Sequence, residues 1–113
     1  MKVSEMTNDE LNYAVAVEVM GWKATGGYYT GDFDDPAYGN WHPTESISDA
    51  WQVVEKMREK KFGFSLVAAL TDDTNKNIWM AIFAFGLVVE HKSAPRAICE
   101  AALAMVSKLK GEI

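Results

Sequence analysis

Three segments of the chain carry apolar residues at the spacing of an amphipathic helix. They are about residues 8–20, about residues 46–60, and the stretch that begins after Ser93 and ends at Gly111. Thr7, directly before the first segment, and Glu10, in its first turn, form the pattern of a capping box, and Ser46 and Ser93 are placed as N-cap residues of the other two. The sequence therefore predicts three helices with chemically marked beginnings.

The second and third helices are each predicted to bury one stripe of side chains. In the second, this stripe is Ile47, Ala50, Trp51, Val54 and Met57. In the third, it is richer in small residues and comprises Ala94, Ala97, Ile98, Ala101, Ala102, Met105 and Leu109. We expect Trp51 to be a core residue whose indole N–H finds an acceptor, and Trp79 to be a core residue as well.

Two segments between these helices are predicted to be strands. Residues 62–70 place apolar side chains on one side at period two, whereas residues 78–85 are apolar on both sides. The second pattern is typical of a central strand that is covered on both faces. Gly86 is placed at a bend before a further apolar run at residues 87–90.

The segment from Trp22 to Trp41 has a different composition. It contains several glycines and aspartates, six aromatic residues and almost no aliphatic ones. This composition predicts a loop, with a short hairpin through Tyr28 and Tyr29.

The order of the elements predicts an α+β protein. We expect an α/β/α sandwich with a small, mostly antiparallel sheet and three helices, forming a single domain over residues 1–113. If the helices cover only one face of so small a sheet, a second copy of the chain is expected to cover the other. A homodimer is therefore one expectation from the sequence.

Composition and charge narrow the class of partner. The net charge of −5 disfavours non-specific binding to nucleic acid, which needs a positive field. The single cysteine, Cys99, excludes a disulfide within the chain. The N-terminus is polar and no apolar run reaches about 18 residues, so we expect a reduced, cytoplasmic compartment and no membrane.

Three pieces of the chain, in matching order, resemble the phage ABA-sandwich domain proteins and the related NinX-type proteins of tailed phages. They are residues 4–12, residues 43–57 and residues 93–103. The resemblance implies a small phage or prophage accessory protein in the cytoplasm of a bacterial host. It brings over no catalytic residue, because the matching residues are helix caps and core positions, which indicate fold and not chemistry.

Several residues of types that carry chemistry also have a plain structural explanation. An acidic cluster has oxygen ligands for a hard cation but departs from the calcium-loop spacing, and its members are Asp32, Asp34 and Asp35. His42 and His91 have no nucleophile motif beside them, and Cys99 lies near a buried stripe with no base nearby. We therefore predict no catalytic residue, no metal site and no cofactor, with the cluster read as a solvated acidic loop.

The aromatic segment is the best candidate for function, because rigid aromatic side chains bind partners at a low entropy cost. The candidate binding residues are Tyr28, Tyr29, Phe33, Tyr38, Trp41 and His42. We expect a non-enzymatic module that binds a host or phage protein through this segment and the adjoining helix ends. The alternative is a binding protein that sequesters a small nucleotide-like ligand against host defence. Two other interpretations assign no binding role to the segment. In one, its aromatic rings only cover one face of the sheet. In the other, His42 and an aspartate form a small hydrolase site.

Overall fold

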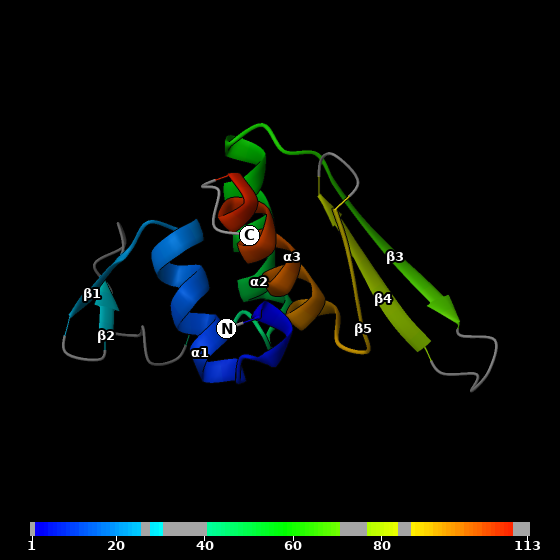
Figure 1. Ribbon diagram of the computed structural model, residues 1–113, viewed down its shortest axis with the longest axis horizontal. Helices are drawn as coiled ribbons and strands as arrows, with labels where there is room; N and C mark the ends of the chain where they lie inside the picture. The colour runs from blue at the N-terminus through cyan, green and yellow to red at the C-terminus, as the bar shows by residue number, and fades with distance from the viewer. Residues whose placement is uncertain (1, 26–27, 31–40, 71–76, 84–86, 110–113) are drawn as a thin grey trace.

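The structure is a computed structural model and describes residues 2–25, 28–30, 41–70, 77–83 and 87–109. The helical elements are η1 (Val3–Glu5), α1 (Asn8–Ala14), η2 (Val15–Val19), α2 (Ile47–Glu59) and α3 (Ala94–Leu109). The strands are β1 (Lys23–Thr25), β2 (Tyr28–Thr30), β3 (Phe64–Leu70), β4 (Asn77–Phe83) and β5 (Leu87–His91). Figure 1 shows the β1–β2 hairpin and the three-stranded sheet at opposite ends of the molecule, with the helices between them.

The N-terminal helix begins and ends where the sequence predicts. The amide of Glu10 donates to Thr7 Oγ1 at 3.1 Å, and the amide of Thr7 donates to Glu10 Oε1 at 2.8 Å, so the capping box is complete. α1 continues without a break into η2, a turn of π-helix. Gly21 then ends the helix with φ of +77°, a conformation that glycine adopts without steric cost.

The start of α2 is tied to the turn that precedes it. The side chain of Ser46 accepts from the amide of Asp49 at 3.3 Å, which confirms Ser46 as the N-cap residue. The carboxylate of Asp49 accepts from the backbone amide of His42 at 2.9 Å. Because this carboxylate bridges to the turn, residues 41–46 are fixed against the first turn of the helix.

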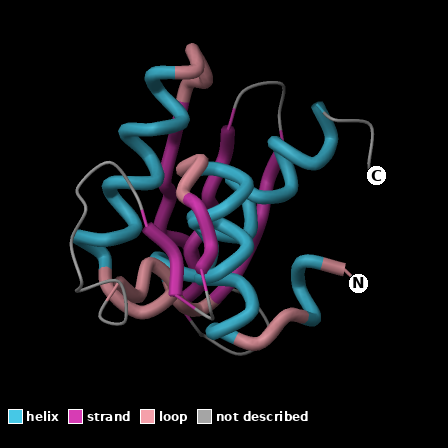
Figure 2. The backbone as a smooth tube through the Cα atoms, turned by 90° about the vertical axis from the view of Figure 1, so that its left-hand side faces the viewer, coloured by secondary structure: helices cyan, strands magenta, loops and turns pink. Residues whose placement is uncertain are grey.

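The three-stranded sheet is antiparallel with the order β3-β4-β5, so β4 is the central strand as predicted. β3 pairs with β4 from Phe64 opposite Phe83 to Leu70 opposite Asn77. One face of the sheet carries Ala81 and Phe83, which are fully buried against α3. Figure 2 shows the helices in front of this sheet, on one side of it.

The α+β class, the small antiparallel sheet and the three helices are confirmed. The hairpin predicted through Tyr28 and Tyr29 is also confirmed, because β1 and β2 pair antiparallel with Ala24 opposite Tyr29. The strand boundaries agree with the predicted ranges within about two residues. On the opposite face of the three-stranded sheet, the described residues place no helix.

The predicted stripe of α2 was wrong at its aromatic residue. Trp51 is 46% exposed and Ile47 is 51% exposed. The buried side of α2 is formed instead by Ala50, Val53, Val54 and Met57. Including Val53 turns this side away from Trp51, whose ring rests edge-on against Phe64 of β3 with a centroid distance of 6.0 Å.

Two other predicted core residues lie at the margin of the core. Leu109 is 60% exposed, because it is the last residue of α3 and extends past the packed layers. Trp79 is half-buried and lies near the start of β4, on the same face as Ala81 and Phe83 but outside the buried core. The rest of the predicted α3 stripe is buried as expected.

An ion pair at the start of α3 was not predicted. The guanidinium of Arg96 donates to Glu100 Oε2 at 2.6 Å, and both side chains are buried. The same guanidinium donates to Asn8 Oδ1 at 2.7 Å and to the backbone oxygen of Met6 at 2.6 Å. These bonds join α3 to the N-terminal segment across about ninety residues of sequence.

Candidate functional site

The two ends of the aromatic segment meet at a pair of tryptophans. The rings of Trp22 and Trp41 lie 4.5 Å apart between centroids and are tilted by 56°. Both side chains are buried, and the indole N–H of Trp41 donates to Gln52 Oε1 at 2.7 Å. Trp22 is held to the preceding helix by its amide, which donates to the carbonyl of Ala16 at 2.9 Å. The segment therefore leaves and returns to the helical core at one fixed point.

The turn after Trp41 is held by the first helix as well. The amide of Thr44 donates to Asn12 Oδ1 at 3.1 Å, and both residues are buried. Together with the bond from His42 to Asp49, this contact fixes the position of α2 beside the tryptophan pair.

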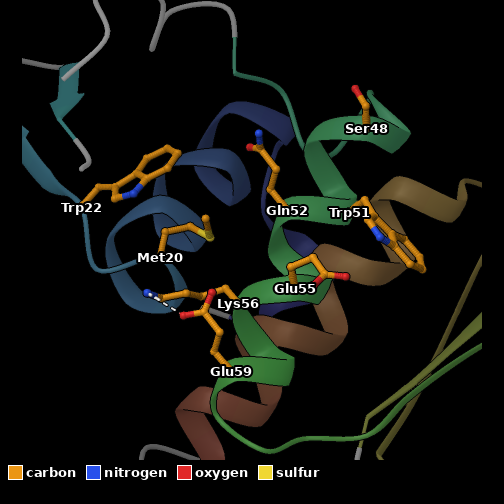
Figure 3. Close-up of a pocket in the computed structure, with 8 residues that line it drawn as sticks. All are labelled: Met20, Trp22, Ser48, Trp51, Gln52, Glu55, Lys56 and Glu59. Carbon is orange, nitrogen blue, oxygen red and sulfur yellow. Dashed lines mark ion pairs between the residues drawn. The ribbon is translucent and has the colours of Figure 1, made fainter. Parts of the chain in front are cut away.

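An open pocket of about 320 Å³ lies next to this pair, on the outer side of α2. It is lined by Met20, Trp22, Ser48, Trp51, Gln52, Glu55, Lys56 and Glu59, which we call the α2 surface. Figure 3 shows Met20 and Trp22 on one side of α2 and Trp51 on the other, with Gln52 between them. Because five of the eight residues are exposed, this is a shallow surface and not an enclosed cavity.

The charges of the α2 surface are largely paired. The ammonium of Lys56 lies 3.8 Å from Glu59 Oε1, and the guanidinium of the neighbouring Arg58 lies 3.1 Å from Glu55 Oε1. Since these pairs are exposed, each contributes little to stability. Their effect is to leave an aromatic surface with a locally balanced charge.

The predicted binding residues divide into three groups. Tyr28 and Tyr29 lie on β2, with Tyr28 opposite Thr25 in the hairpin. Trp41 is in the buried pair, and His42 is exposed beside it. Phe33 and Tyr38 lie outside the described residues, as do the three aspartates of the acidic cluster, Asp32, Asp34 and Asp35.

Trp51 was not predicted at this site. The sequence held one signal for it: a stripe of Ala50, Val53, Val54 and Met57 also has helical spacing and excludes position 51, although the spacing alone does not favour this stripe over the predicted one. Met20 was not predicted at the site because it belongs to the end of the first helix, just before the aromatic segment to which function was assigned.

The two histidines make hydrogen bonds that stabilise the local turns. The described hydrogen bonds of His42 are made by its backbone: the amide donates to Asp49, and the carbonyl accepts from the amides of Glu45 and Ser46. Within the described residues no carboxylate is hydrogen-bonded to its imidazole. His91 Nδ1 accepts from the amide of Ser93 at 2.9 Å and so helps to form the turn before α3.

Cys99 lies inside the core of the protein and not at the α2 surface. Burial raises the pKa of its thiol well above the ordinary value, and the nearby Arg96 opposes this only in part. The thiol is therefore protonated at neutral pH and a poor nucleophile. Among the described residues, no group of three His, Cys, Asp or Glu side chains could hold a metal ion. No helix in the described ranges has the length and apolar character needed to cross a bilayer.

Comparison with known proteins agrees with this architecture. A solved phage protein from Bacillus cereus ATCC 14579 is 26% identical in sequence and superposes with a TM-score of 0.62, covering 90% of this chain and 89% of that one. No curated protein matches the chain. The family model of the phage ABA sandwich domain matches residues 13–103, which span α2, the whole three-stranded sheet and α3 as far as Leu103. The chain therefore belongs to the phage ABA sandwich domain family.

Proposed function

We propose that this phage-family protein is a non-enzymatic binding module that engages a host or phage protein through the α2 surface and the adjoining aromatic segment. The observation that carries the proposal is the exposure of Trp51, at 46%, beside the pocket on α2. A tryptophan side chain exposed on a packed helix lacks the large favourable free energy that its burial would contribute. Binding of a partner would recover that gain.

The composition of the α2 surface resembles that of a protein interface. Tryptophan and methionine are enriched in such interfaces, and binding energy concentrates on a few aromatic residues surrounded by polar ones. Trp51, Trp22 and Met20 supply the apolar part. Ser48, Gln52 and the two ion pairs supply a polar rim.

The rigid placement of these residues also favours binding. Trp22 is buried against Trp41, which is bonded to Gln52 on α2, so the two sides of the surface are connected. A surface that is ordered before binding loses less conformational entropy when it forms a complex. The open, shallow shape suits the side chains of another protein better than a substrate that must be enclosed.

Capture experiments with matched variants test the proposal. The immobilised wild-type chain, the Trp51→Ala variant and the Leu109→Ala variant are each incubated with lysate from infected bacteria, and bound proteins are identified by mass spectrometry. Leu109 is a suitable control, because it is 60% exposed and lies on a different helix, outside the α2 surface. We expect a captured protein that binds about tenfold or more weakly to Trp51→Ala and equally well to Leu109→Ala.

The contribution of the aromatic segment is measured separately. A double variant, Tyr28→Ala with Tyr29→Ala, is compared with wild type for the same captured protein by calorimetry. A loss of affinity assigns the hairpin to the interface. If neither this variant nor Trp51→Ala changes any captured species, the proposed surface is wrong.

A small nucleotide-like ligand is the second candidate function. The volume of about 320 Å³ favours it, since it falls at the lower end of the range for small-molecule sites. The charges oppose it, because Glu55 and Glu59 line the pocket and Lys56 is paired with Glu59. Mass spectrometry of small molecules released from the captured wild-type chain decides the matter: a nucleotide that is absent from Trp51→Ala would replace the protein partner as the ligand.

A further inference from the structure

The three-stranded sheet has an outer face that points away from α3. Two rows of side chains cross this face: Val67, Met80 and Glu90 form one, and Ser65, Ile82 and Val88 form the other. We call these six residues the outer sheet face. Val67 and Val88 are 43% and 42% exposed, and Met80 and Ile82 on the central strand are half-buried between them.

Because β4 is apolar on both sides, we expect another surface to bury its outer side as well. Its inner residues, Ala81 and Phe83, are buried under α3. Its outer residues, Met80 and Ile82, are absent from the buried core, and no described helix packs on them. A strand with this pattern is typical of a sheet that is covered on both faces.

We propose that the outer sheet face is the contact between two copies of this chain, packed sheet against sheet around a twofold axis. In such a contact the same surface serves both partners, so it must be self-complementary. The outer sheet face meets this requirement, because apolar side chains occupy the central strand while each edge strand carries one apolar and one polar residue, Val67 with Ser65 on β3 and Val88 with Glu90 on β5. This order of apolar centre and polar rim is the usual anatomy of an interface.

The size of the face sets the expected strength of the contact. Three strands spaced about 4.8 Å apart and rising about 3.3 Å per residue over seven residues give a plane of roughly 330 Å² per copy. The two copies together then cover roughly 660 Å², which is below the area of about 1,200–2,000 Å² typical of a stable complex. We therefore infer a weak dimer that forms with rising concentration.

The charge of the chain permits a second copy to bind only if the charged residue of the face stays in contact with solvent. Each chain carries a net charge of −5, which opposes self-association over long distances. On the outer sheet face itself, Glu90 is the one charged residue and is exposed on the edge strand β5. At that edge its carboxylate reaches solvent in a face-to-face pair, so the apolar centre can close without burying a charge.

Sedimentation equilibrium over about 1 μM to 1 mM tests the proposal on the full chain. We expect the wild-type mass to rise towards that of a dimer over this range. The Val67→Lys and Val88→Lys variants each place a cation on an edge strand, directly beside the apolar central strand, and should weaken association about tenfold or more. Ile47→Lys is the matched control, because Ile47 is a β-branched residue that is 51% exposed on α2 and should leave association unchanged.

A measurement on the wild-type chain alone guards against variants that fail to fold. Methyl NMR signals of Met80 and Ile82 should shift on dilution, whereas those of the fully buried Met57 should not. Wild-type chain that stays monomeric across the range overturns the proposal. So do folded lysine variants that dimerise like wild type, or an Ile47→Lys variant that disrupts the dimer as strongly as they do.

Discussion

Helix α3 is surrounded by protein along most of its length, whereas α2, which packs beside it, buries one stripe and leaves the other side in water. The difference extends to their charges. The Arg96–Glu100 pair of α3 is buried, and the Arg58–Glu55 pair of α2 is 61% and 50% exposed. α3 therefore holds the fold together from its centre, and α2 covers one side of it while exposing its own other side to solvent.

The largest expected effect comes from breaking the buried pair. Glu100→Ala leaves the Arg96 guanidinium inside the protein without its carboxylate, which costs about 3–5 kcal/mol of unfolding free energy for buried pairs in general. Urea unfolding of the purified variant measures this cost. Glu55→Ala removes the matching carboxylate from the exposed pair and should change the same free energy by about 0.5 kcal/mol or less.

Equal effects of these two substitutions would contradict the comparison between the helices. A small effect of Glu100→Ala, below about 1 kcal/mol, would mean that water reaches Arg96 in solution. The bonds from Arg96 to Asn8 and Met6 would then contribute little to holding the N-terminal segment.

The buried stripe of α2 is tested by Met57→Ala. Met57 is fully buried in the core, so truncation removes apolar contacts and leaves a cavity. The expected loss is about 2–5 kcal/mol of unfolding free energy, again measured by urea unfolding. A loss below about 1 kcal/mol would show that the core rearranges to fill the space.

Trp51→Ala should cost much less, although it removes a larger side chain. The ring is 46% exposed and its described aromatic contact is the edge-on one with Phe64. We expect a loss of about 0.5–1.5 kcal/mol, the usual contribution of such an aromatic pair. A loss of about 3–5 kcal/mol is typical of a buried tryptophan and would restore the original assignment of Trp51 to the core.

The contrast between Met57 and Trp51 illustrates what the sequence could predict. Capping residues such as Thr7 and Ser46 act on backbone groups within a few residues, so the helix starts were found correctly. The alternation of apolar residues gave the central strand β4 for the same local reason. Both features depend on neighbours in the sequence.

Features that depend on distant parts of the chain could not be predicted in this way. The orientation of α2 is decided by what packs on it, and a stripe through Trp51 is as regular in the sequence as one through Val53. Arg96 finds partners at Met6 and Asn8, which no local pattern connects to α3. The α2 surface was missed for the same reason, since Trp22 and Trp51 come to line one pocket only in the folded chain.

Of the effects considered, ionisation of the Cys99 thiol is expected to change stability least at neutral pH. The thiol nevertheless reports directly on the interior of α3. Burial raises the pKa of the folded thiol above its value of about 8.5 in an unfolded chain. Since thiolate is the reactive form, iodoacetamide should label the native protein far more slowly than the urea-unfolded protein at pH 8. Labelling of the native protein at the rate of the unfolded chain would contradict the burial of this helix.

The raised pKa also fixes the sign of a pH effect. Below about pH 8.5 both states hold the thiol proton, and the stability contribution of Cys99 is fully present. As the pH rises further, the unfolded chain releases the proton while the folded chain keeps it, so the free energy of unfolding falls. Urea unfolding at pH 7 and at pH 10 should show this fall in wild type and a smaller one in Cys99→Ala, because alanine has no proton to release.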